Sequence, residues 1–199
     1  MIKINSPFSI LEFGSTKLSL AIYDKSILNQ SSFYEEKIEY TSNEKSNEEK
    51  SIVNIIKRAE KDIGQHLNEV ILMLDSYSIY SIDFSIQKNY DKKIISPEDI
   101  DYLIKECENI IKTNNKEKEI LHTIKSQIIF DDKVIENLEN ISQEVYKVTL
   151  ELKFILINKK IYNFFKNLFF KRHISIKNTF CSSYIKSLGL INENGISGY

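Results

Sequence analysis

The order of apolar patterns in the first 75 residues constrains the fold of this chain most strongly. Three short apolar runs come first, at 8–13, 17–24 and 33–40. A helical stripe follows, formed by Ile52, Ile56, Ala59 and Ile63. Gly64 then stands where a helix C-terminal residue with positive φ is expected. The next run, "EVILMLD", is typical of a strand buried on both faces, so the segment predicts β-β-β-α-β.

Residues 76–157 predict a different succession, namely strand, helix, strand and strand. Ser96 is a hydroxyl cap, Pro97 takes the first helical position, and acidic residues fill the first turn, which together mark a helix start. The last strand, at 145–157, alternates apolar and polar residues as a strand with one solvated face does. We expect these elements to form a compact unit inserted into the first one. Helix, strand and helix follow it, at 161–169, 173–177 and 179–189.

Composition excludes several classes of protein. Lysine and arginine number 27 against 28 acidic residues, and this balance argues against a nucleic-acid binder. Cys107 and Cys181 match no metal or redox spacing, so we expect two small buried hydrophobic residues and no metal site. The N-terminus lacks the features of a signal peptide, and no apolar run approaches the roughly 20 residues of a membrane helix.

The stretch "LEFGSTKLSLAIYD" places a glycine and two hydroxyl residues between two apolar runs. Gly14, Ser15 and Thr16 predict a tight turn, and Lys17 follows at once. Such a turn can be an ordinary hairpin that uses glycine to reverse direction. It can also be a backbone cradle whose N–H groups approach a phosphate, which requires glycine and small neighbours. The residues of the turn leave both interpretations open.

Three segments together resemble the bacterial cell-division protein family FtsA, which has an actin-like fold. "EFGSTK", residues 12–17, is similar to its first phosphate motif D-I-G-T-S-K, with Glu12 in place of the aspartate. "ILHTIKSQIIFDDKVIENLENI" follows the L-H-x-I segment and the I-x-N-P-x-G-L loop of the family. In it the matching residues are Leu121, His122, Ile124, Ile135 and Asn137, while Leu138 and Asn140 replace proline and glycine. "FCSSYIKSLG" resembles the L-A-S-S-Y helix, with Ser182, Ser183 and Tyr184 in place.

The resemblance implies an α/β fold with two parts. The first is an actin-like, RNase H-like subdomain built from 7–75 and 158–190, and the second is an inserted α+β subdomain at 76–157. Members of the family bind ATP with Mg between two RNase H-like halves. Here the resemblance assigns the first phosphate contact to five residues, Glu12, Gly14, Ser15, Thr16 and Lys17. The second phosphate motif would begin at Gly198, where the sequence stops, so we expect a truncated form without catalytic activity or bound cofactor.

The same resemblance implies a cell-division adaptor that acts through protein–protein contacts at the cytoplasmic face of the membrane. Its implied partners are the tubulin-like FtsZ, other division proteins and further copies of itself. The parts of the family that bind FtsZ and the membrane are not present in this sequence. We therefore expect the insert to make the contacts, through the strand at 145–157 if it lies at a sheet edge. Lys147 and Lys153 on its solvated face would discourage indiscriminate pairing.

Two other functions share this superfold. One is half of an ATPase or sugar kinase, which is disfavoured because the sequence has no second phosphate motif and no catalytic acid at a recognisable spacing. The other is an actin-like pilus-assembly adaptor, over which the L-H-x-I segment and the I-x-N loop favour FtsA. His122 lacks a partner at ligand spacing and fits a structural position in a strand. Ser182 and Ser183 lack the G-x-S-x-G elbow of a hydrolase nucleophile.

Overall fold

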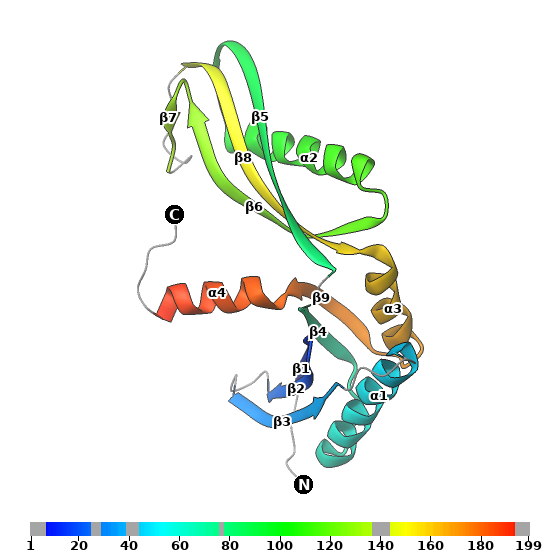
Figure 1. The fold of residues 1–199 in the computed structure, drawn as a ribbon. Helices are drawn as coiled ribbons and strands as arrows, with labels where there is room; N and C mark the ends of the chain where they lie inside the picture. The colour runs from blue at the N-terminus through cyan, green and yellow to red at the C-terminus, as the bar shows by residue number, and fades with distance from the viewer. Residues whose placement is uncertain (1–6, 25–28, 39–43, 76–77, 137–143, 194–199) are drawn as a thin grey trace. The chain divides into compact units, whose positions relative to one another are not determined.

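The computed structural model describes residues 7–24, 29–38, 44–75, 78–136 and 144–193. The chain divides into two compact units, one formed by 1–78 with 160–198 and the other by 79–159 (Figure 1). Each unit contains one β-sheet. Asn137, Leu138 and Asn140 of the loop motif lie outside the described residues, as does Gly198 near the C-terminus.

The first unit contains a five-stranded sheet in the order β3-β2-β1-β4-β9. The strands are β1 (Pro7–Phe13), β2 (Lys17–Asp24), β3 (Asn29–Lys37), β4 (Glu69–Leu74) and β9 (Ser175–Cys181). The first three pair antiparallel as consecutive hairpins, whereas β4 runs parallel to β1 and β9 runs parallel to β4. The carboxyl ends of β1, β4 and β9 therefore meet at one edge of the sheet.

Helices cover both faces of this sheet (Figure 1). On one face lie α1 (Glu44–Ile63) and α3 (Lys159–Phe170), and α4 (Ser182–Glu193) lies on the other. The ring of Phe13 packs against the ring of Phe165 in α3, with 5.2 Å between the ring centroids. Successive side chains of a strand point to opposite faces, so Glu12, the neighbour of Phe13, faces α4.

The structure confirms some predictions for this unit and corrects others. Gly64 ends α1 with a φ of 72°, as expected, and both cysteines are buried. The prediction that the "EVILMLD" strand is buried on both faces is wrong, because Val70, Leu72 and Leu74 are buried whereas Ile71 and Met73 are only partly so. The predicted last strand at 173–177 exists, but its bounds are wrong, since β9 begins at Ser175 and pairs with β4 as far as Cys181.

The second unit contains an antiparallel sheet in the order β5-β8-β6-β7. Its elements are β5 (Ile79–Ile94), α2 (Pro97–Asn114), β6 (Lys118–Phe130), β7 (Lys133–Val134) and β8 (Glu144–Asn158). The predicted helix start is confirmed by a capping box. The Asp99 N–H donates to the Ser96 hydroxyl, and the Ser96 N–H donates to the Asp99 carboxylate at 3.0 Å.

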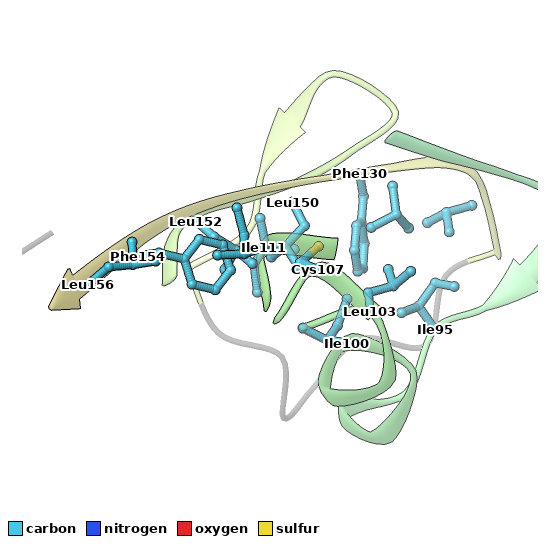
Figure 2. Close-up of a cluster of buried hydrophobic side chains, with 13 residues drawn as sticks. Ile95, Ile100, Leu103, Cys107, Ile111, Phe130, Leu150, Leu152, Phe154 and Leu156 are labelled. Carbon is cyan, nitrogen blue, oxygen red and sulfur yellow. The ribbon is translucent and has the colours of Figure 1, made fainter. Parts of the chain in front are cut away.

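The apolar face of α2 and one face of this sheet enclose a separate core (Figure 2). Its buried residues are Ile95, Ile100, Leu103, Cys107, Ile111, Ile128, Phe130, Val145, Val148, Leu150, Leu152, Phe154 and Leu156. Strand β8 supplies six of these residues, and five of them, from Val148 to Leu156, alternate as the period-2 pattern predicts.

The premise that the strand at 145–157 lies at a sheet edge is wrong. β8 pairs with β5 on one side and with β6 on the other, so its backbone N–H and C=O groups are engaged by neighbouring strands. Alternation of apolar and polar side chains along a strand indicates that one face of its sheet is solvated. It carries no information on whether the strand has one neighbour or two.

Candidate functional site

The turn between β1 and β2 is closed by a backbone hydrogen bond, in which the Gly14 N–H donates to the Lys17 carbonyl at 2.9 Å. A Cβ atom on residue 14 would lie 3.2 Å from that carbonyl oxygen, tighter than ordinary van der Waals contact. Glycine therefore permits the close approach of the two strands at this point. Ser15 and Thr16 are exposed at the tip of the turn.

The ammonium group of Lys17 is held by the neighbouring strand. Its Nζ atom lies 2.9 Å from Glu35 Oε2 in β3, and both side chains are about half exposed. The hydrogen bond and the charge of Glu35 raise the pKa of Lys17. Lys17 is therefore a cation whose charge is partly balanced by the carboxylate of Glu35, next to the turn.

Glu12 accepts two hydrogen bonds on a single carboxylate oxygen. The Ser182 hydroxyl and the Lys186 ammonium group both donate to Oε1. Burial raises the pKa of this carboxyl, but the hydrogen bonds from Lys186 and Ser182 and the charges of Lys186 and Lys17 outweigh it, so that the pKa is lowered. Glu12 is therefore an ionised, internally neutralised carboxylate at neutral pH.

Two residues of α4 reach Glu12 because they share a helix face. Ser182 is the first residue of α4 and is fully buried, and Lys186 follows four positions later, one turn along the same side. Sequence reasoning assigned Glu12 to the site but missed Lys186, which lies 174 positions away. The available signal was the i, i+4 spacing of a serine and a lysine in a helix that directly follows a strand of the sheet.

Asp75 is a second acidic residue near the turn that sequence reasoning missed. It follows β4 directly, and its N–H donates to the carbonyl of Phe13, the last residue of β1, at 3.0 Å. Its side chain is exposed. The carboxyl ends of β1 and β4 and the start of α4 thus bring together Glu12, Asp75 and Lys186 around one end of the sheet.

The contacts of Glu12 show whether this site fits the metal and nucleotide that the resemblance implies. In that resemblance the residue at position 12 organises a cation and its water near the phosphates. Here the same carboxylate is bound by an ammonium and a hydroxyl group, so it does not fit that role. Within the described residues, no group of three or more His, Cys, Asp or Glu side chains is arranged to hold a metal ion.

The two lysines assigned to protein contact lie in the other unit. Lys147 Nζ is 2.6 Å from Asp132, and Lys153 Nζ is 3.4 Å from Asp83 in β5. Both acidic partners are largely exposed, so the pairs belong to the solvated surface of the sheet. His122 is partly buried in β6, and burial lowers its pKa, so the ring is neutral at pH 7.

No known protein family matches the chain by sequence, and no curated protein does either. Among solved structures, one chain of a PilM–PilN type IV pilus biogenesis complex is similar with a TM-score of 0.53 and 11% identity. The alignment covers 92% of this chain and 49% of that one. The chain thus spans about half the length of this relative.

Two further structures are more distantly similar. The cytoplasmic domain of EpsL, an inner-membrane component of the type II secretion system of Vibrio cholerae, has a TM-score of 0.44 at 9% identity, covering 88% of this chain and 57% of that one. A Bacteroides thetaiotaomicron protein of unknown function has an actin-like ATPase fold and a TM-score of 0.41 at 14% identity, covering 98% and 59%. The predicted α/β fold class is confirmed, since the described part of the chain contains two sheets and four helices and shares the fold of the pilus biogenesis chain. None of the helices in the described ranges has the length and apolar character needed to cross a bilayer.

Proposed function

We propose that this chain is an actin-like adaptor of a pilus-biogenesis type of assembly, acting through protein–protein contacts at the cytoplasmic face of the membrane. The observation that carries the proposal is the extent of the likeness to the pilus biogenesis protein. It covers 92% of this chain and so includes the inserted sheet as well as the actin-like half. This extent favours the pilus-type role over the FtsA role, which rests on short motifs.

Binding rather than catalysis is the activity that the phosphate turn supports. Glu12 is committed to Lys186 and Ser182, and Lys17 is committed to Glu35. A carboxylate and an ammonium that neutralise internal partners have little capacity left to organise a metal–nucleotide complex. We therefore propose that neither ATP hydrolysis nor tight nucleotide binding is part of the function of this chain.

The outer edge of β5 is the surface that we propose for the contact. β5 extends from Ile79 to Ile94 and pairs with β8 on one side, while the sheet order places no further strand of the described residues on its other side. An open strand edge offers N–H and C=O groups to an extended partner segment. The open edge of β5 thus takes the contact role that the sequence prediction gave to β8, because β8 is paired on both sides.

A gene deletion separates the two adaptor roles. In cells that carry this gene, we expect its loss to abolish surface pili or the corresponding secretion while septum formation continues normally. Microscopy of cell length and electron microscopy of surface filaments measure the two phenotypes in one culture. Filamentous cells with normal surface structures would instead assign the chain to cell division and overturn the proposal.

A pair of proline substitutions tests the edge. Adjacent N–H groups of a strand point to opposite sides, so Ser85→Pro and Ile86→Pro remove one donor from the β8 ladder and one from the open edge. Because the Ile86 side chain also packs against the core, each proline variant is compared with the alanine variant at the same position. Relative to alanine, we expect one proline variant to lose thermal stability and the other to keep it but fail to complement the deletion. Full complementation by the stable variant would show that the β5 edge is not the contact surface.

A further inference from the structure

A cavity of about 230 Å³ lies in the first unit where α1 and α3 approach each other. Its lining residues are Glu49, Ile56, Glu60, His66, Leu168, Lys171, Arg172 and Ile174. The lining thus combines an apolar floor with five charged or titratable side chains. It is on the sheet face opposite α4 and shares no residue with the Glu12 site.

Arg172 is the residue of this cavity with an unmet bonding requirement. Its Nε–H group is buried and has no hydrogen-bond partner within the described part of the chain. A buried donor without an acceptor is costly and uncommon in a native protein. The only other arginine of the chain, Arg58, bonds Glu36 at 3.0 Å and lies 5.9 Å from the ring centre of Tyr34. Arg58 thus has a carboxylate partner in the described part of the chain, whereas Arg172 has a buried donor without one.

Two cations and two carboxylates line the cavity, and one of the carboxylates already has partners. Glu60 is already engaged, because its Oε1 lies 2.6 Å from His66 Nδ1 and accepts the Leu67 N–H at 3.1 Å. The remaining charged groups are the cations of Lys171 and Arg172 and the exposed carboxylate of Glu49. Lys171 and Arg172 are therefore the two groups of the lining that can attract an anion.

We infer that this cavity binds a carboxylate group. The planar guanidinium fork of Arg172 matches the geometry of a carboxylate, and a small rotation toward the cavity would give Nε the acceptor that it lacks. Lys171 supplies a second cation, and Ile56, Leu168 and Ile174 supply apolar contact for the carbon atoms next to the carboxylate. The volume is below the range of about 300–1,000 Å³ that is typical of drug-sized ligands. It therefore suits a small organic acid or one acidic side chain.

The presence of two arginines makes the test direct. In an ¹⁵N-labelled sample the Nε–H groups give two side-chain signals, one from each arginine. We expect titration with sodium acetate to shift the Arg172 signal saturably and to leave the Arg58 signal in place, at constant ionic strength kept with sodium chloride. Equal shifts of both signals, or no shift of either, would overturn the site.

Variants separate a bound carboxylate from general electrostatics, with the backbone amides of Lys171 and Ile174 as the reporter. Arg172→Gln should abolish saturable binding, and Arg172→Lys, which keeps the charge but not the fork, should weaken it about fivefold. Glu49→Gln removes a repulsive charge and should tighten binding about twofold. Arg58→Gln is the matched control and should leave the affinity unchanged. An Arg172→Lys variant that binds as tightly as the parent would exclude a role for the guanidinium fork.

The source of the carboxylate is distinguished by the choice of probe. Saturable binding of acetate assigns the cavity to a free small acid, whereas binding of an N-acetyl-glutamyl amide in preference to acetate assigns it to an acidic side chain of a peptide. Either result supports the inference. Tighter binding of inorganic phosphate than of both carboxylate probes would overturn it. All three titrations are independent of any pilus or division phenotype, so this inference and the proposed function can fail separately.

Discussion

At the scale of single residues, Glu12 links strand β1 to helix α4 through Lys186 and Ser182. Glu12→Gln removes a charge-assisted bond in a partly buried position, and we expect a loss of about 1–2 kcal/mol in the free energy of unfolding at pH 7. The folded-state pKa of Glu12 is lowered, so this stabilisation is present above the unfolded-state pKa and is lost as the pH falls through the folded-state value. The difference between parent and variant should therefore shrink below about pH 4.

Urea unfolding from pH 7 down to pH 3 measures this difference. Glu35→Gln is the matched control, since it breaks the other carboxylate–lysine pair near the same turn but in an exposed position. Water and salt screen an exposed pair of this kind, so it should contribute less to stability than the Glu12 pair. Equal losses in the two variants, or a Glu12→Gln effect that does not depend on pH, would contradict the role assigned to the buried pair.

At the scale of elements, two helices end with a residue in the left-handed conformation, once with glycine and once without. Gly64 ends α1 at a φ of 72°, and its N–H donates to the Glu60 carbonyl. His173 ends α3 at a φ of 57°, where its N–H and that of Ile174 bond Phe170 and Phe169 in a Schellman motif. We expect Gly64→Ala to lower the free energy of unfolding by about 1 kcal/mol and His173→Gly to raise it by about 0.5 kcal/mol.

Thermal or urea denaturation of the two variants beside the parent provides the measurement. His173→Ala is the control for the imidazole ring, because it removes the ring but keeps the Cβ that makes this conformation unfavourable. It should leave stability nearly unchanged. A gain with alanine as large as the gain with glycine would show that the ring, and not the backbone conformation, was responsible.

At the scale of the whole molecule, the insert has the properties of a unit that folds by itself. Its core is formed entirely within 79–159, and roughly 80 residues suffice for an independent domain. Ile79 pairs with Ile157, so its two ends lie on neighbouring strands and excision would leave them together. We expect the isolated segment to unfold cooperatively by circular dichroism. Leu150→Ala should destabilise it by about 2–5 kcal/mol. A segment without a cooperative transition would contradict this expectation.

Local patterns in the sequence were sufficient for most helices and strands, whereas the actin-like fold was implied by the resemblance of three segments to a known family. The three- and four-residue spacing from Ile52 to Ile63 required an amphipathic helix, Ser96 and Asp99 specified where α2 begins, and alternation along β8 specified which of its side chains enter the core. These features depend on neighbours a few positions apart, and the physics of caps, turns and periodicity acts over that range.

Strand neighbours and long-range side-chain contacts were decided by the tertiary structure. β8 lies inside its sheet because β5 and β6 both pair with it, and an alternating pattern is compatible with either an edge or a central place. The sequence alone determined that residue 12 is an acid beside a glycine turn. Only the parallel placement of β9 beside β4 brought α4 close enough for Lys186 to neutralise that acid, since contacts between residues 174 positions apart depend on how the whole sheet is assembled.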